Sequence, residues 1–320
     1  MFSIEIFLPA FISFALTVLL CPIFIPILHR MKFGQFIREE GPESHLKKAG
    51  TPTMGGIVML AAFTVSSLAY MLNEPQIFPV ILLTVGFGFI GFLDDFIKLA
   101  KKRSLGLRAW QKLGLQIVLT GYFAYVIMSD YPELTQIIIP FTGGQVAWNL
   151  GVLFVPFVFV AVLGTVNGAN FTDGLDGLAT SVTVVIAMFF VVLSLKIGSP
   201  VYITAMIMVG TLLGFLIFNT YPAKVFMGDT GSLALGGFVA AEAFMLKAPL
   251  FIIIVAFIYL AEILSVMLQV SYFKITHGKR IFKMSPIHHH FELSGFEETR
   301  VVAMFTVVTI LCCFIGFIAL

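Results

Sequence analysis

The sequence predicts an all-α integral membrane protein that crosses the bilayer many times, and three observations carry this prediction. Hydrophobic residues make up 59% of the 320 positions and charged residues only 11%, against about 45–50% and about 25% in ordinary soluble domains. The mean hydropathy is +1.03, and 35 phenylalanines are more than one water-soluble core would bury. The apolar residues also gather in runs of the length that a membrane helix needs, about 20 residues.

We expect ten membrane-spanning helices. The apolar runs cover residues 2–28, 54–72, 77–97, 113–128, 150–166, 177–196, 201–218, 233–247, 249–273 and 301–320. The run 233–247 is the weakest of them, because it is short and contains glycine. No basic residue precedes the first run, which we therefore interpret as a retained span rather than a cleavable signal peptide.

The positive charges predict the orientation of these helices. An even number of spans places both termini on one side. With the termini outside, the inner segments 29–53, 98–112, 167–176, 219–232 and 274–300 hold 17 of the 19 Lys and Arg residues. Cytoplasmic loops carry this excess of Lys and Arg, so we expect both termini outside. All six His and five of the six Asp lie on the inner side too, which predicts an active site at the cytoplasmic face.

Composition excludes several other kinds of protein. The net charge is only +2 and the basic clusters flank apolar runs, so topology explains them and nucleic-acid binding is not expected. Cys21, Cys312 and Cys313 lie inside apolar runs without CxxC spacing, which indicates neither a disulfide framework nor a zinc site. The chain also lacks a GxxxxGK[ST] loop and a GxSxG elbow. No internal repeat or linker is evident, so we expect one domain over residues 1–320.

Two adjacent carboxylates, Asp94 and Asp95, close the third apolar run. Carboxylates at a helix C-terminus oppose the helix dipole, at a cost of about 0.3–1 kcal/mol each, and acids at a membrane boundary usually serve function. Neighbours on a helix point about 100° apart, so we expect two different roles. The alternative is a structural ion pair with Lys98 or Lys101, one turn further on.

Two further inner segments combine polar side chains with glycine. The segment 167–176 contains Asn170, Asp173 and Asp176 but no basic residue. It suits a metal, a polar base or a phosphate at the start of the next helix, and the alternative is a capped turn. Lys48 precedes a loop with Gly and Pro, where exposed backbone N–H groups and a cation suit an anion. The alternative there is a basic loop that only sets topology.

Asp229 and a run of three histidines complete the set. Asp229 lies in a Gly-Asp-Thr-Gly turn, where a carboxylate can bind a hard cation, unless it is an ordinary Asp turn. His288, His289 and His290 lack the i, i+4 spacing of a helical metal pair. We expect them in an extended or turn segment that contacts phosphate, with a zinc site as the alternative. Carboxylates, Gly-rich loops, Lys and His together favour Mg²⁺-assisted phosphoryl transfer.

The motifs also match a known family. The stretches GPESHLKKAGTPTMGG, GFLDDFIK, NGANFTDGLDGLA, FNTYPAKVFMGDTGSLALGG and KMSPIHHHFE follow one another between Gly41 and Glu292. With them the chain resembles the polyprenyl-phosphate hexose-1-phosphate transferase superfamily. TPTMGG and PIHHHFE point to its phospho-N-acetylmuramoyl-pentapeptide branch.

The resemblance implies a reaction of peptidoglycan synthesis. Undecaprenyl phosphate attacks the β-phosphate of UDP-N-acetylmuramoyl-pentapeptide, UMP leaves and lipid I forms. The resemblance further implies Mg²⁺ as cofactor, ten membrane helices with both termini outside, a homodimer, and a place in the plasma membrane of a bacterium.

The resemblance also implies roles for individual residues. Asp229 is the metal ligand. Asp94 is the base or the partner of the substrate phosphate, or else a covalent nucleophile, and Asp95 lies beside it. Asn170 and Asp173 belong to the same polar site.

The remaining assignments concern binding of the sugar nucleotide. The diphosphate is held by His288, the histidine that we count as catalytic, together with His289 and His290. The nucleoside pocket consists of Lys48, Asp176, Asn219 and Phe226, with the Phe226 ring stacked on uracil.

Two other functions stay open at this point. One is a polyprenyl-phosphate N-acetylhexosamine-1-phosphate transferase of the same superfamily, which would share the Asp loops. The other is a membrane transporter, which would need ionisable residues at mid-membrane. Only Glu262 and Glu242 are acids well inside the apolar runs, and we interpret Glu262 as a buried, hydrogen-bonded acid between helices.

Overall fold

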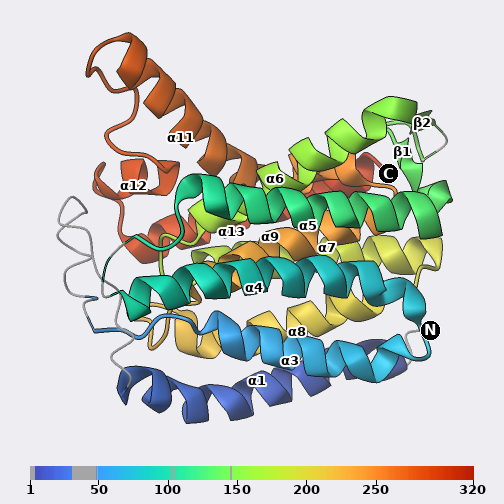
Figure 1. Ribbon diagram of the computed structural model, residues 1–320, viewed down its shortest axis with the longest axis horizontal. Helices are drawn as coiled ribbons and strands as arrows, with labels where there is room; N and C mark the ends of the chain where they lie inside the picture. Colours follow the sequence, from blue (N-terminus) through green and yellow to red (C-terminus); the bar gives the residue numbers. More distant parts are fainter. Residues whose placement is uncertain (1–3, 31–47, 49, 102, 104, 145) are drawn as a thin grey trace.

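The computed structural model describes residues 4–30, 48, 50–101, 103, 105–144 and 146–320 (Figure 1). These residues are almost entirely helical. The strands among them form one antiparallel ribbon, β1 (Gln136–Ile138) with β2 (Ala147–Asn149), in which Ile137 lies opposite Trp148. The all-α class predicted from the composition is thus confirmed.

The helices are joined by connections of very different length, such as residues 131–153 between α5 and α6 and residues 173–177 between α6 and α7. In the described parts of the chain, four single turns of 3-10 helix lie between the helices, at Pro75–Ile77, Pro132–Thr135, Gly151–Leu153 and Pro249–Phe251. The α-helices are α1 (Ile4–Arg30), α3 (Gly56–Met71), α4 (Phe78–Ala100), α5 (Ala109–Asp130), α6 (Phe154–Thr172), α7 (Leu178–Ile197), α8 (Tyr202–Asn219), α9 (Gly228–Met245), α10 (Ile252–Val255), α11 (Phe257–Ile275), α12 (Ile287–Glu292) and α13 (Glu298–Ile318). Most of the long helices run side by side, whereas α11 diverges from the bundle and α12 lies just below α11 in Figure 1.

Eight helical segments of the described chain are long and apolar enough to cross a membrane. They coincide with eight of the ten predicted spans. The second predicted span falls on α3, an apolar helix of 16 residues, and the eighth falls on α9. The chain is therefore a polytopic membrane protein.

The prediction of one continuous ninth helix over residues 249–273 is wrong. Ala256, with φ −103° and ψ 33°, leaves the helical conformation and separates α10 from α11. Residues 252–258 around it are all apolar, and no proline lies between residues 252 and 273, so hydropathy carries no sign of this break.

Helix α9 occupies the centre of the bundle and packs against α4, α6, α3 and α7. Every residue from Thr230 to Met245 is buried, so α9 is enclosed on all sides. Small residues permit this close packing. A Cβ added to Gly236 would lie 2.4 Å from Val166 Cα of α6. The same tight packing brings the first turn of α9 against the last turns of α4 and α6.

Candidate active site

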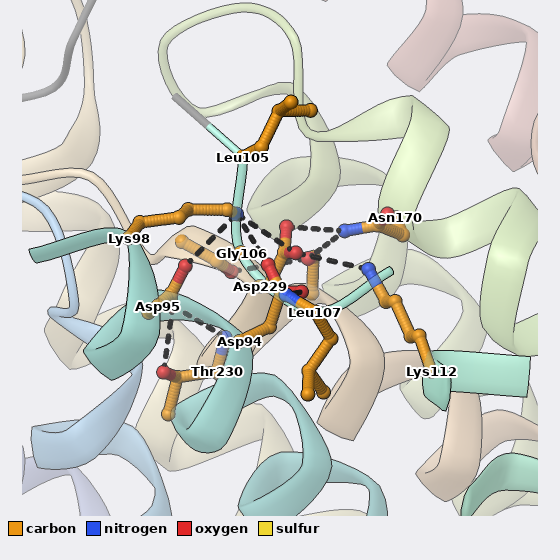
Figure 2. A network of polar contacts seen from close by, with 12 residues as sticks. Asp94, Asp95, Lys98, Leu105, Gly106, Leu107, Lys112, Asn170, Asp229 and Thr230 are labelled. Atoms are coloured by element: carbon orange, nitrogen blue, oxygen red, sulfur yellow. Dashed lines mark hydrogen bonds and ion pairs between the residues drawn. The ribbon is translucent and has the colours of Figure 1, made fainter. Parts of the chain in front are cut away.

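Three carboxylates converge where the end of α4 meets the beginning of α9 (Figure 2). Asp94 and Asp95 come from α4 and Asp229 from the first turn of α9. Each offers one oxygen that lies within 4.8 Å of the others. The aspartates of α4 and that of α9 are about 135 residues apart in the sequence. The packing of α4 on α9 therefore brings them together.

The two adjacent aspartates have different partners, as their expected 100° divergence requires. Asp94 Oδ1 accepts the backbone N–H of Leu107 at 2.9 Å. Asp95 Oδ2 accepts both the backbone N–H and the hydroxyl of Thr230, at 2.9 and 2.8 Å. Gly228 has φ +70°, and a Cβ there would lie 2.6 Å from Asp95 Oδ2. Asp95 thus ties α4 to the start of α9, while Asp94 faces the loop before α5.

Two lysines surround the carboxylates. The Nζ atom of Lys98 lies 2.7 Å from Asp94 Oδ2, 3.4 Å from Asp95 Oδ1 and 3.0 Å from Asp229 Oδ2. Lys112 Nζ lies 2.9 Å from Asp229 Oδ2. The ion pair with Lys98 that we weighed as a structural alternative therefore exists, and it belongs to the same cluster. The sequence did not single out Lys112, because a lysine beside a membrane span is usually explained by the positive-inside rule.

Asn170, near the end of α6, joins the cluster as expected. Its Nδ2 donates to Asp229 Oδ1 at 3.0 Å and to Ser232 Oγ at 2.8 Å. Burial raises the pKa of Asp229, but the charges of Lys112 and Lys98 outweigh burial and hold that pKa far below its ordinary value. Asp229 is therefore a permanent anion at the centre of this site.

Asp173 follows α6 directly. Burial, together with the negative charges of Asp229 and Asp95, raises the pKa of its carboxyl well above the ordinary value. Asp173 lies three residues after Asn170, and its role in the polar site stays a prediction.

A second polar cluster joins Lys48, Asp176 and Glu298. Lys48 Nζ lies 2.7 Å from Asp176 Oδ1 and 2.5 Å from Glu298 Oε1. Glu298 Oε1 also accepts the backbone N–H of Asp176 at 2.7 Å, and Asp176 Oδ2 accepts that of Ala223 at 2.9 Å. Burial lowers the pKa of Lys48, but these two carboxylates outweigh it and raise the pKa overall. Glu298 was missed, since an acid in the first turn of a helix is common.

Asn219 and Phe226 border the loop between α8 and α9. Asn219 is buried, accepts the hydroxyl of Thr180 at 2.7 Å and donates to the carbonyl of Val225 at 3.0 Å. Its side chain thus holds the loop in shape. Phe226 is half-buried, and its backbone bonds to segment 52–55 at both N–H and C=O, at 2.9 and 2.8 Å. The stacking role of its ring stays a prediction.

The expectation of an extended or turn segment for the three histidines is wrong. They lie in the short helix α12, which begins after Pro286. Successive residues on a helix diverge by about 100°, so the rings have separate partners: His288 Nδ1 pairs with Glu262 Oε1 at 3.0 Å, His289 Nδ1 with Glu292 Oε2 at 2.7 Å, and His290 Nδ1 accepts the N–H of Lys283 at 3.1 Å. Of the described residues only the aspartate cluster groups three metal-binding side chains, which leaves the zinc alternative without support.

Comparison with known proteins identifies the family. Residues 77–247 match the family model described as glycosyl transferase family 4. A protein of Clostridium kluyveri is 51% identical over 312 residues, which cover 97% of this chain and 97% of that protein. A protein of Acetivibrio thermocellus is 50% identical over 97% of this chain and 93% of its own length, and one of Clostridium perfringens is 50% identical over 97% and 96%. All three are named phospho-N-acetylmuramoyl-pentapeptide-transferase. At this identity over nearly its whole length, the chain belongs to the phospho-N-acetylmuramoyl-pentapeptide-transferase family, a family of membrane-bound phosphotransferases.

Proposed function

We propose that this chain transfers phospho-N-acetylmuramoyl-pentapeptide from UDP-N-acetylmuramoyl-pentapeptide to undecaprenyl phosphate, which releases UMP and forms lipid I. The observation that carries the proposal is the cluster of Asp94, Asp95 and Asp229, with Asn170 bound to it, in a member of this family. Such a cluster suits phosphoryl transfer, in which positioning and charge neutralisation do most of the work.

The aspartate cluster fits Mg²⁺. Its donors are carboxylate oxygens, the ligands that this hard cation prefers, and three of them converge within 4.8 Å. The ammonium group of Lys98 already contacts all three carboxylates, which shows that a positive charge is accommodated there. When bound, Mg²⁺ would neutralise charge on the substrate diphosphate. We assign Asp229 as its ligand, because its side chain is 20% exposed, against 4% and 5% for Asp94 and Asp95.

Asp94 and Asp95 divide the remaining work in this proposal. Asp95 is held by Thr230 and keeps Asp229 in register with α4. Asp94 receives the lipid phosphate, as base or as orienting partner. The second pKa of a phosphate monoester is about 6, so the acceptor is mostly ionised at neutral pH. An oxygen of the lipid phosphate attacks the β-phosphorus, and the bond to the UMP oxygen breaks. A covalent phospho-Asp94 intermediate is the competing mechanism.

The Lys48–Asp176–Glu298 cluster and the loop that Asn219 holds would form the nucleoside side of the site. Asn219 braces this loop, whose next residues carry the half-buried Phe226 ring. We assign uracil to that ring and the substrate diphosphate to the histidines of α12. Asn170 and Asp173 would lie between these two sides.

The location of the site follows from the same helix ends. The end of α4, the end of α6 and the start of α9 all border segments that the Lys and Arg distribution assigns to the cytoplasm. We therefore propose an active site at the cytoplasmic face of a bacterial plasma membrane, both termini outside, and a single domain over residues 1–320 that forms a homodimer. Membership of a transferase family removes the ground for the transporter alternative.

The test is UMP release by the purified protein in detergent with undecaprenyl phosphate. UDP-N-acetylmuramoyl-pentapeptide and UDP-N-acetylglucosamine are compared as donors, each with Mg²⁺ and with EDTA. We expect UMP only from the muramoyl-pentapeptide donor and only with Mg²⁺. Equal or faster release from UDP-N-acetylglucosamine would assign the chain to the N-acetylhexosamine branch, and undiminished release in EDTA would refute the metal.

A further inference from the structure

Helix α11 buries an acid that the proposed reaction does not use. Glu262 has no exposed surface, and its Oε1 lies 3.0 Å from Nδ1 of His288, which is 1% exposed. Its second oxygen, Oε2, has no hydrogen-bond partner among the described residues. Among the described residues, its side chain makes its hydrogen bond to the imidazole alone.

The other nitrogen of the same ring is also buried and without a partner. No described residue bonds to His288 Nε2, although leaving such a group unpaired costs about 1–3 kcal/mol. A Cβ added to Gly174 would lie only 2.1 Å from Nε2. The nitrogen therefore lies directly against the turn between α6 and α7, and the missing side chain of Gly174 leaves room for it.

This turn links the two polar clusters of the site. Asn170, four residues before Gly174, bonds to Asp229. Asp176, two residues after it, bonds to Lys48. The free nitrogen of His288 thus lies between the proposed metal site and the proposed nucleoside pocket. In a sugar nucleotide the diphosphate links the sugar to the nucleoside and is the group that Mg²⁺ binds, so it would lie between these two sites.

We propose that Glu262 is a positioning residue, which holds Nδ1 of His288 so that Nε2 is presented at the Gly174 turn to the substrate diphosphate. A carboxylate on one imidazole nitrogen fixes the ring orientation and determines which nitrogen carries the proton. The inference rests on the proposed function for the identity of the substrate. The Glu262–His288 contact itself does not depend on it.

A double-mutant cycle tests the coupling. Turnover of UMP release is measured for the wild type, Glu262→Leu, Glu262→Gln, His288→Ala and Glu262→Leu/His288→Ala. Loss of an orienting partner typically costs about 10–100-fold in activity, so Glu262→Leu should lower kcat by that factor. It should cost little more once His288 is alanine. Glu262→Gln keeps an oxygen acceptor for Nδ1–H and should stay near the wild-type rate. Losses that multiply in the double variant would overturn the proposal.

Glu242 provides a matched control. It is a fully buried acid in α9, and its Oε1 accepts the hydroxyl of Thr204 at 2.7 Å rather than a histidine. Glu242→Leu removes the same kind of group from the same membrane interior. We expect its effect on turnover and on thermal unfolding to be the same with His288 present or absent. If Glu242→Leu were as strongly coupled to His288 as Glu262→Leu, the coupling would report general loosening, and the proposal would fail.

NMR signals of the His288 ring test the inference without any measurement of activity, and so separate it from the proposed function. In protein labelled with ¹⁵N-histidine, the His288 ring signals are those that disappear in His288→Ala. We expect them to shift in Glu262→Leu and in Gly174→Ala, whose methyl group would displace the ring, and to stay in place in Glu242→Leu. Unchanged His288 signals in Glu262→Leu would overturn the positioning role. A wild type that releases no UMP would refute the proposed function and leave this result standing.

Discussion

Gly91 of α4 is the point on which the geometry of the aspartate cluster depends most directly. A Cβ added there would lie 2.0 Å from the carbonyl oxygen of Asp229, 2.4 Å from its carbonyl carbon and 2.6 Å from the nitrogen of Thr230. All three are backbone atoms, so no side chain can rotate away. Carbon and oxygen without a covalent bond approach to about 3.3 Å, so Gly91→Ala must push the start of α9 away from α4 by about 1.3 Å.

Such a shift would disturb the cluster more than the fold. Overpacking of a close interface costs about 1–3 kcal/mol of stability, which a large bundle tolerates. A displacement of about 1 Å between reacting groups costs about 100-fold in rate, because Asp229 would leave its register with Asp94 and Asp95. We therefore expect Gly91→Ala to fold with a modestly lower Tm and to release UMP about 100-fold more slowly.

The matched control is Gly114→Ala in α5, where a Cβ would meet nothing within 4 Å. Alanine is favoured over glycine in a helix by up to about 1 kcal/mol, so this variant should keep full turnover and an equal or higher Tm. Detergent-purified proteins are compared by UMP release at saturating Mg²⁺ and both substrates, and by thermal unfolding. Wild-type turnover in Gly91→Ala would refute the reasoning, as would a comparable loss in Gly114→Ala.

Four further predictions address single side chains. Asp229→Asn should lower turnover by orders of magnitude, since metal-assisted charge stabilisation is worth several kcal/mol; near-normal UMP release at saturating Mg²⁺ would exclude Asp229 as ligand. Phe226→Ala should weaken binding of the UDP-sugar by about 1–3 kcal/mol and leave lipid-phosphate affinity unchanged, measured by titration calorimetry with each substrate; equal losses would indicate misfolding instead. Asp94→Asn should lose most activity at about pH 6 and less above about pH 8, where the acceptor phosphate is already ionised; a pH-independent ratio of wild-type to variant rates would favour a covalent nucleophile. Glu298→Ala removes the charge-assisted hydrogen bonds to Lys48 and should lower the free energy of unfolding by about 1.5–3 kcal/mol, measured by denaturant titration; an unchanged stability would show that Glu298 is not needed to hold this cluster.

The sequence alone determined the class of the protein and most of its spans. Hydropathy predicts membrane helices well because lipid favours apolar side chains. The backbone groups in lipid must bond to one another, which a helix allows. The sequence also singled out Asp94, Asp95 and Asp229 as candidate site residues, because acids at a membrane boundary usually serve function. The motif order led to the family, which the comparisons confirmed.

Only the tertiary structure decided which residues meet. Lys112 and Glu298 carry no local signal, since their partners Asp229 and Lys48 are more than one hundred residues away. The three histidine side chains diverge because they lie in the short helix α12. This helix has only six residues, too few for hydrophobic periodicity to predict a helix from the sequence. The contact of Glu262 with His288 depends on where α11 and α12 pack against each other. Such contacts depend on packing across the bundle, and local periodicity contains no information about distances between helices that are far apart in the chain.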